Sequence, residues 1–182
     1  AIDHDNSNFK HSNFSEYSIK SWEYWCKKNN VDFHVITEHN KDYGYPIWNK
    51  LDVVDVCDKY EYVGIVDCDT MIKWDAPNIF DTLEDGIYGV KDDINMNWVV
   101  NSVENYRKEF FNVDIDLDKY INAGVVFLHH ESLRVYKILR DFYIQNKDIL
   151  DSWNKGGGRE QTLFNYMAQT NDFKINLLPS TW

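Results

Sequence analysis

Two carboxylates separated by one residue are the clearest chemical feature of the sequence. Asp67-Cys68-Asp69 follows residues 62–66, a nearly all-apolar run that is typical of a strand buried on both faces. In an extended segment residues i and i+2 point to the same side, so the two carboxylates are expected to converge and to repel each other. A divalent cation that prefers oxygen ligands, Mn²⁺ or Mg²⁺, would relieve this repulsion. The alternative is a strand-end turn, where aspartate is common.

A second candidate lies inside the predicted strand over residues 120–128. Asn122-Ala123-Gly124 places an amide beside two small residues. Glycine weakens a strand unless another group must approach closely, so the segment would suit the recognition of hydroxyl groups. A β-bulge in a core strand explains the same residues equally well.

A third candidate begins at the triple glycine of residues 156–158, which predicts a mobile loop ahead of a helix over 159–169. Glu160 and Gln161 fall in the first turn of that helix, where the helix dipole favours an acid. Asn165 follows one turn later. Taken alone, this motif is better explained as simple helix capping.

The elements that would position these residues alternate along the chain. Apolar spacing predicts helices over 16–28, from Pro46 onward, over 131–146 and over 159–169. Strands are predicted over 31–36, 62–66, 87–90, 120–128 and 173–178, whereas 94–118 fits neither pattern. This alternation indicates an α/β fold with a central sheet flanked by helices, in which ligands bind beyond the carboxyl ends of strands.

Composition excludes several classes of function. Lys and Arg total 19 and Asp and Glu total 30, so the formal charge is 19 − 30 = −11. We therefore expect no nucleic-acid partner and no electrostatic docking on anionic membranes. We also expect no transmembrane segment, because no apolar run approaches the roughly 20 residues that a spanning helix needs. Three cysteines without a CxxC pair favour a reducing, cytoplasmic location.

In this order the three candidates resemble the metal-dependent, nucleotide-sugar-using glycosyltransferases of the GT-A fold. Residues 51–70 are similar to the family's helix, strand and DxD motif, and residues 120–128 to the (Y/F)-(F/I)-N-(A/S)-G-V strand of family 8 and related transferases. Residues 160–165 resemble their D-Q-x-x-x-N helix, with Glu160 in place of the usual Asp. The resemblance implies one Rossmann-like GT-A domain over 1–182 with a mixed central sheet flanked by helices. We expect it to lack its first residues and a C-terminal extension.

The resemblance also implies how a donor would be held. Asp67 and Asp69 would bind Mn²⁺ or Mg²⁺ on the diphosphate of a nucleotide-sugar, most simply a UDP-sugar, with Asp67 also near the ribose. Lys50 occupies the place of a basic residue that contacts the donor, and Asp3 would meet the nucleoside. Many family members add a histidine as third metal ligand near the C-terminal end, but this sequence has no His after His130.

The acceptor side follows from the same resemblance. Asn122 and Ala123 would line the sugar pocket, and Glu160 and Gln161 would face the sugar and the acceptor as catalytic residues. The acceptor would be a glycan or a lipid-linked molecule. An inverting enzyme needs a carboxylate base, for which Glu160 and Asp92 are candidates, whereas similarity to family 8 favours retention.

Two rival functions have different requirements. A haloacid dehalogenase-type phosphohydrolase also sets D-x-D after an apolar strand, but its motif continues D-x-D-x-T, and here Met71 stands where that Thr is needed. A non-catalytic module of the same fold would bind the cation and the nucleotide-sugar without turning it over. The short chain and the missing histidine favour such a module.

Overall fold

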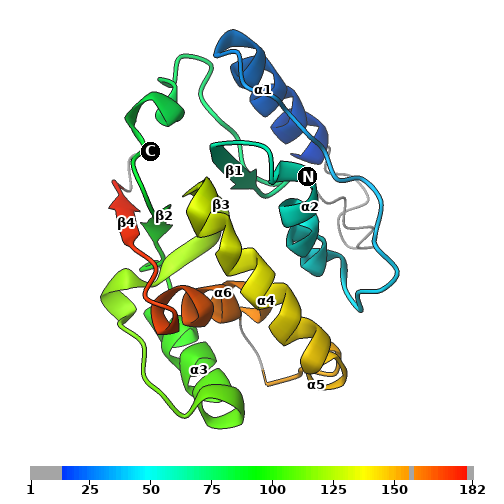
Figure 1. Cartoon of the computed structure of the whole chain (residues 1–182), viewed down its shortest axis with the longest axis vertical. Helices are drawn as coiled ribbons and strands as arrows, with labels where there is room; N and C mark the ends of the chain where they lie inside the picture. The colour runs from blue at the N-terminus through cyan, green and yellow to red at the C-terminus, as the bar shows by residue number, and fades with distance from the viewer. Residues whose placement is uncertain (1–13, 156–157, 180–182) are drawn as a thin grey trace. The chain divides into compact units, whose positions relative to one another are not determined.

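The computed structural model describes residues 14–155 and 158–179, which contain both helices and strands (Figure 1). The helices are α1 (Phe14–Lys28), α2 (Val53–Cys57), α3 (Met96–Tyr106), α4 (Arg134–Gln145), α5 (Lys147–Asp151) and α6 (Arg159–Thr170). The strands are β1 (Tyr62–Val66), β2 (Ile87–Lys91), β3 (Ile121–His129) and β4 (Ile175–Leu178). Within the described residues, every helix falls short of the length and apolar content that a bilayer crossing requires.

The four strands form one mixed sheet in the order β1-β3-β2-β4. Strand β2 runs antiparallel to β3 and parallel to β4. The strands predicted over 62–66, 87–90, 120–128 and 173–178 correspond to these four, so the predicted α/β class with a mixed sheet and flanking helices is confirmed.

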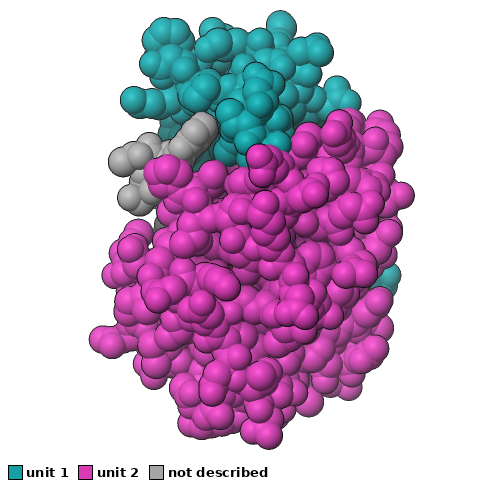
Figure 2. All heavy atoms as spheres, turned by 60° about the vertical axis from the view of Figure 1, so that its left-hand side comes forward, with its two compact units in different colours: residues 1–49, 66–83 teal, residues 50–65, 84–182 magenta. Residues whose placement is uncertain are grey.

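The chain divides into two compact units, which are described separately (Figure 2). Unit 1 comprises residues 1–49 and 66–83, and unit 2 comprises residues 50–65 and 84–182. The aspartate pair therefore belongs to unit 1, whereas the other described candidate residues belong to unit 2.

Unit 1 is organised around two buried tryptophans of α1. Trp22 and Trp25 are 6% and 1% exposed, and their rings meet edge to face with centroids 6.0 Å apart. The indole N–H of Trp25 donates to the carbonyl oxygen of Ala76 at 3.0 Å, and its ring contacts Phe80. Burial of these rings and their contacts with Ala76 and Phe80 hold this segment of unit 1 against α1.

The strand predicted over residues 31–36 does not form. Val31, Phe33 and Val35 are less exposed than Asp32 and His34, so the alternation is present. A strand also needs a neighbour for its ladder of hydrogen bonds, and no ladder to this segment occurs among the described residues. That prediction is therefore wrong, although the pattern behind it was real.

Unit 2 holds the sheet and its core. Helix α6 packs against β3, α3 and α4, with Leu163, Phe164 and Ala168 fully buried. The helix predicted from Pro46 starts there but is a 3₁₀ helix over Pro46–Asp52 before α2. Similarly, the helix predicted over 131–146 begins as a 3₁₀ turn at His130–Leu133 and continues as α4.

The unassigned region 94–118 contains α3 and a following π-helical turn. Asn95 caps α3, since its side-chain oxygen accepts from the backbone N–H of Trp98 at 3.2 Å. The π-helical residues Arg107–Phe111 end at Asn112, whose φ of 49° is left-handed. The segment thus places the buried face of α3 against α6.

Gly86 is required where β2 enters the sheet beside β4. Its φ is +124°, and a Cβ there would lie 2.7 Å from the Lys174 carbonyl oxygen and 2.7 Å from Asn176 Nδ2.

We predict that Gly86→Ala lowers the free energy of unfolding by about 2 kcal/mol, because the strained backbone and the clash act together. Urea unfolding measures this, with the exposed Glu84→Ala as neighbouring control. Equal stability of the two variants would contradict the prediction.

Candidate functional site

Asp67 and Asp69 lie in a turn rather than in an extension of β1. The Thr70 backbone N–H and hydroxyl both donate to the Asp67 carbonyl oxygen, at 3.1 and 2.7 Å. The indole N–H of Trp22 donates to that hydroxyl at 3.1 Å, which fixes the turn on α1. The expectation that strand geometry aligns the two carboxylates is therefore corrected, because the turn sets their directions. Asp69 is exposed, and Asp67 is half-buried.

Strand β3 contains a β-bulge, which was the alternative explanation for residues 122–124. Gly89 pairs with Val126, so regular antiparallel pairing would place Lys91 opposite Gly124. Lys91 instead pairs with Ile121, which leaves 124 − 121 = 3 additional residues on β3. Backbone groups in this segment therefore lose their cross-strand partners and must find others.

Asparagine side chains supply some of those partners. The Asn165 side chain accepts from the Ile121 N–H and donates to the Ile121 carbonyl oxygen, both at 2.9 Å. Asn122 accepts from the backbone N–H of Gly124 at 2.8 Å, closing a local turn. Asn165 is fully buried and Asn122 is exposed. The two asparagines that the sequence singled out thus both stabilise the bulge.

Gln161 and Lys50 bind the two backbone groups of Ala123. The Ala123 N–H donates to Gln161 Oε1 at 3.0 Å, and the Ala123 carbonyl oxygen accepts from Lys50 Nζ at 3.1 Å. Lys50 Nζ also lies 2.7 Å from Glu160 Oε1, with side-chain exposures of 6% and 7%. The ion pair therefore lies in the interior, where the loss of either partner leaves a buried charge.

Asp92 is the carboxylate of this cluster that reaches solvent. Gln161 Nε2 donates to Asp92 Oδ2 at 2.7 Å, and Asn122 Nδ2 donates to the same oxygen at 3.4 Å. Asp92 is half-buried, whereas Gln161 is 8% exposed. The buried Gln161 amide thus fixes the more accessible Asp92 carboxylate beside the exposed Asn122. Together, Asp92 and Asn122 can accept hydrogen bonds from hydroxyl groups of a ligand and donate hydrogen bonds to them.

Three buried hydroxyl groups form a hydrogen-bonded chain that reaches the side chain of Gln161. Thr162 Oγ1 is hydrogen-bonded to Tyr120 OH at 2.8 Å and to Ser102 Oγ at 2.6 Å. Gln161 Nε2 lies 3.5 Å from the Tyr120 hydroxyl. Burial raises the pKa of Tyr120 to about 12. The phenol therefore stays protonated at neutral pH.

Gly158 has a packing role at the start of α6. A Cβ there would lie 2.5 Å from Thr162 Oγ1 and 2.9 Å from the ring of Trp98. The glycine allows α3 and α6 to approach closely, which brings Ser102 to Thr162. The other two glycines of the predicted loop, residues 156 and 157, lie outside the described residues.

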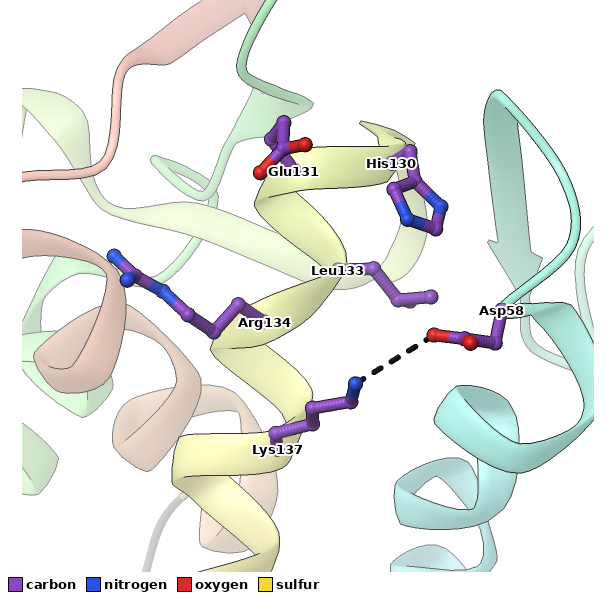
Figure 3. A pocket seen from close by; sticks show the side chains of 6 residues that line it. All are labelled: Asp58, His130, Glu131, Leu133, Arg134 and Lys137. Atoms are coloured by element: carbon purple, nitrogen blue, oxygen red, sulfur yellow. Dashed lines mark ion pairs between the residues drawn. The ribbon is translucent and has the colours of Figure 1, made fainter.

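A separate pocket of about 220 Å³ opens at the start of α4 (Figure 3). Its lining residues are Asp58, His130, Glu131, Leu133, Arg134 and Lys137. Lys137 Nζ lies 3.5 Å from Asp58 Oδ1, and His130 Nδ1 lies 3.1 Å from the Tyr60 carbonyl oxygen. The pocket carries both signs of charge and none of the predicted site residues, so we do not assign the predicted chemistry to it.

The cation that the sequence predicts would depend on Asp67 and Asp69. Residues 14–155 and 158–179 contain no group of three or more His, Cys, Asp or Glu side chains that could hold a metal ion. Two aspartates are nevertheless a suitable donor set, because Mg²⁺ uses one or two carboxylates together with substrate phosphates and water. The residues present thus fit such an ion, and its binding stays a prediction.

The structure brings together the predicted site residues of unit 2 in one hydrogen-bonded cluster with Asp92. These are Lys50, Asn122, Ala123, Glu160 and Gln161. Asp67 and Asp69 share the turn in unit 1, and Asp3 lies outside the described residues.

Sequence reasoning missed the hydroxyl chain of Ser102, Tyr120 and Thr162. Tyr120 was predicted only as a strand residue, and Ser102 lies in the region that fitted no pattern. The helical spacing of Val99, Val103 and Tyr106 could have indicated that Ser102 shares their buried face.

Comparison with known proteins adds no family to these observations. No family model and no curated protein matches the sequence.

The buried ion pair gives a direct test of the cluster. We predict that Lys50→Met lowers the free energy of unfolding by about 3–5 kcal/mol, because the Glu160 carboxylate then stays buried without its cation. The double variant Lys50→Met/Glu160→Gln should lose less, since it leaves no unpaired charge. Chemical denaturation measures both. Lys20→Met, which breaks the exposed Lys20–Glu16 pair, is the control and should change nothing measurable. A double variant as unstable as Lys50→Met would contradict the prediction.

The buried tyrosines predict a loss of stability at alkaline pH. Burial raises the pKa of Tyr120 and of Tyr166 to about 12, above the ordinary value of 10. From pH 10 to 12 the unfolded chain loses these protons and the native state keeps them. Stability that is fully present below pH 10 should therefore fall by about 1.4 kcal/mol per pH unit for each tyrosine.

Two phenylalanine variants compare a buried tyrosine hydroxyl that is hydrogen-bonded with one that is not. Tyr120→Phe should cost about 1 kcal/mol at pH 7, because Thr162 loses a partner, and should flatten the alkaline slope. The Tyr106 hydroxyl is buried without a hydrogen-bond partner among the described residues, so Tyr106→Phe should leave stability at pH 7 unchanged. Denaturant midpoints from pH 7 to 12 measure both, and an unchanged slope in Tyr120→Phe would count against this account.

Proposed function

We propose that the protein is a metal-dependent glycosyltransferase of GT-A type that uses a nucleoside diphosphate sugar, most simply a UDP-sugar. The observation that carries the proposal is the Asp67–Thr70 turn at the carboxyl end of β1, which holds two carboxylates in a chain of net charge −11. Ligands of open α/β sheets bind at such strand ends. A glycan or lipid-linked acceptor completes the proposed reaction.

The charge of the chain supports a cation in this role. A nucleoside diphosphate is anionic, and an acidic protein repels it at long range. When bound, Mn²⁺ or Mg²⁺ supplies the charge that holds the diphosphate and stabilises it as a leaving group. Asp67 and Asp69 hold the ion in this proposal, and the Trp22–Thr70 contact keeps their turn in place.

The burial of the α6 side chains changes which carboxylate is suited to act on the acceptor. Glu160 is 6% exposed and its carboxylate is paired with Lys50, so it acts in our proposal as a positioning residue. Gln161 has the same role, because both ends of its amide are hydrogen-bonded. Asp92 and Asn122 are more accessible. If the reaction inverts, Asp92 is therefore the better-placed base of the two that the sequence offers.

A non-catalytic nucleotide-sugar-binding module is the second candidate. The observation that favours it is the same burial of Glu160 and Gln161, which occupies both side chains with structural hydrogen bonds. Such a module would bind UDP with Mn²⁺ and leave a UDP-sugar intact, whereas a transferase would hydrolyse the donor slowly without acceptor. Release of UDP over hours therefore separates the two candidates.

The aspartate turn provides the test of donor binding. We predict that UDP raises the melting temperature only when Mn²⁺ is present, because a ligand that binds only the native state stabilises it. Asp69→Asn should weaken Mn²⁺-dependent UDP binding by at least about tenfold in calorimetric titration, since the ion loses a charged ligand. The stability of the free protein should not fall, because one of two like charges is removed.

Asp75→Asn is the matched control for that experiment. Asp75 is an exposed aspartate on the same segment but outside the turn, so its removal tests for a general effect of charge. It should leave the affinity for UDP unchanged. Normal UDP binding by Asp69→Asn would show that the site is assigned wrongly, and phosphate release from an aryl phosphate would instead favour the phosphohydrolase.

A further inference from the structure

Thr70 closes the aspartate turn, residues 67–70, through both its backbone and its side chain. Its N–H donates to the Asp67 carbonyl oxygen at 3.1 Å, and its hydroxyl donates to the same oxygen at 2.7 Å. A carbonyl oxygen has two lone pairs, so these two hydrogen bonds use its whole capacity as an acceptor. The main-chain oxygen of Asp67 is therefore not available as a ligand for a cation.

Trp22 fixes the direction of the Thr70 hydroxyl. An indole N–H can only donate, and that of Trp22 lies 3.1 Å from Thr70 Oγ1. The hydroxyl oxygen accepts this bond, and its own proton points to the Asp67 carbonyl oxygen. Trp22 is 6% exposed, whereas Thr70 is half-buried. A buried indole thus holds the hydroxyl in the orientation that occupies the Asp67 carbonyl oxygen.

The segment that follows the turn is also attached to α1. The backbone N–H of Ile72 donates to Ser21 Oγ at 3.3 Å, and the Trp74 carbonyl oxygen accepts from Lys28 Nζ at 3.0 Å. The turn is therefore joined to the helix at Thr70 and again beyond it. Opening the turn to offer a main-chain oxygen would break several hydrogen bonds at once.

Divalent cations differ in the ligands that they require from such a turn. Ca²⁺ takes roughly six to eight oxygen ligands in a flexible geometry, and backbone carbonyl oxygens are common among them. Mg²⁺ is smaller, demands near-octahedral geometry and combines one or two carboxylates with waters and substrate phosphates. The aspartate turn offers the carboxylates of Asp67 and Asp69 but not the Asp67 carbonyl oxygen. It therefore suits Mg²⁺ better than Ca²⁺, and Mn²⁺ also accepts octahedral oxygen ligands.

We propose that Thr70, oriented by Trp22, is a positioning residue that makes the aspartate turn selective for Mg²⁺ or Mn²⁺ over Ca²⁺. The inference rests on the proposed function, because it takes this turn as the cation site. It goes further by assigning the choice of cation to a hydroxyl that acts through the Asp67 carbonyl oxygen. Loss of the hydroxyl makes one lone pair of that oxygen available and loosens the turn, and both changes favour the larger Ca²⁺.

Titration calorimetry of UDP with each cation tests this selectivity. The parent protein should bind UDP at least about tenfold more tightly with Mg²⁺ than with Ca²⁺. Thr70→Val keeps the shape of the side chain and removes its hydroxyl. It should weaken binding with Mg²⁺ by about tenfold and binding with Ca²⁺ by less, so the ratio of the two affinities falls. Thr70→Ser keeps the hydroxyl and should retain the parent ratio.

Two further variants separate this role from a general loss of structure. Thr82 Oγ1 donates to the Ile79 carbonyl oxygen at 2.8 Å, which is the same kind of bond elsewhere in unit 1. Thr82→Val should therefore leave the ratio unchanged. Trp22→Phe keeps an aromatic ring without the indole N–H and should lower the ratio as Thr70→Val does. Circular dichroism and the melting temperature without ligand show that each variant is folded.

The outcomes distinguish this inference from the proposed function. Failure of the parent protein to bind UDP with Mg²⁺ would overturn both. Normal binding by the parent, together with an unchanged ratio in Thr70→Val, would overturn the inference alone. Equal affinity of the parent for UDP with Mg²⁺ and with Ca²⁺ would also overturn it, because the turn would then make no choice between the cations.

Discussion

The bulge in β3 is the constraint on which the organisation of unit 2 depends. Three additional residues between Ile121 and Val126 leave backbone N–H and C=O groups in the interior without cross-strand partners, and each such group destabilises the fold unless it is hydrogen-bonded. Lys50 and Gln161 supply partners for the two backbone groups of Ala123, and Asn165 binds both backbone groups of Ile121 at the edge of the bulge. Because the ammonium of Lys50 is itself buried, it requires Glu160 beside it. A local irregularity of one strand thus determines the polar residues of two helices.

This dependence explains why α6 is polar and yet buried. Four polar residues of this helix are at most 8% exposed: Glu160, Gln161, Thr162 and Asn165. Such burial is unusual for polar side chains unless their polar groups are hydrogen-bonded. Their hydrogen bonds run to the bulge, to Lys50 and to the Tyr120 hydroxyl. The motif at residues 160–165 resembles a catalytic signature, but the need to pair buried polar groups also explains its polar residues. The two roles are compatible, because a bulge held rigidly can present the exposed Asn122 and the carboxylate of Asp92 in fixed positions.

Local patterns in the sequence predicted much of the fold and little of the site's geometry. Strand β1 and helix α6 were predicted within one residue, since an apolar run and a helical spacing are properties of the segment itself. The strand over 31–36 failed because pairing needs a neighbour that alternation does not supply. The Asp67–Thr70 turn depends on Trp22, 48 residues from Thr70, and the bulge partner Lys50 lies 73 residues from Ala123. Contacts of that separation leave no local pattern.

Helix α1 fixes both the aspartate turn and the segment that follows it. Trp22 donates to Thr70 at the end of the turn, and Ser21, its neighbour in the chain, accepts from the backbone N–H of Ile72. Lys28, two turns further along the helix, donates to the carbonyl oxygen of Trp74. The path of residues 70–74 therefore depends on side chains of α1 rather than on the hydrogen bonds of a sheet. The proposed cation ligands Asp67 and Asp69 precede this anchored segment directly, so α1 is the element on which their positions depend.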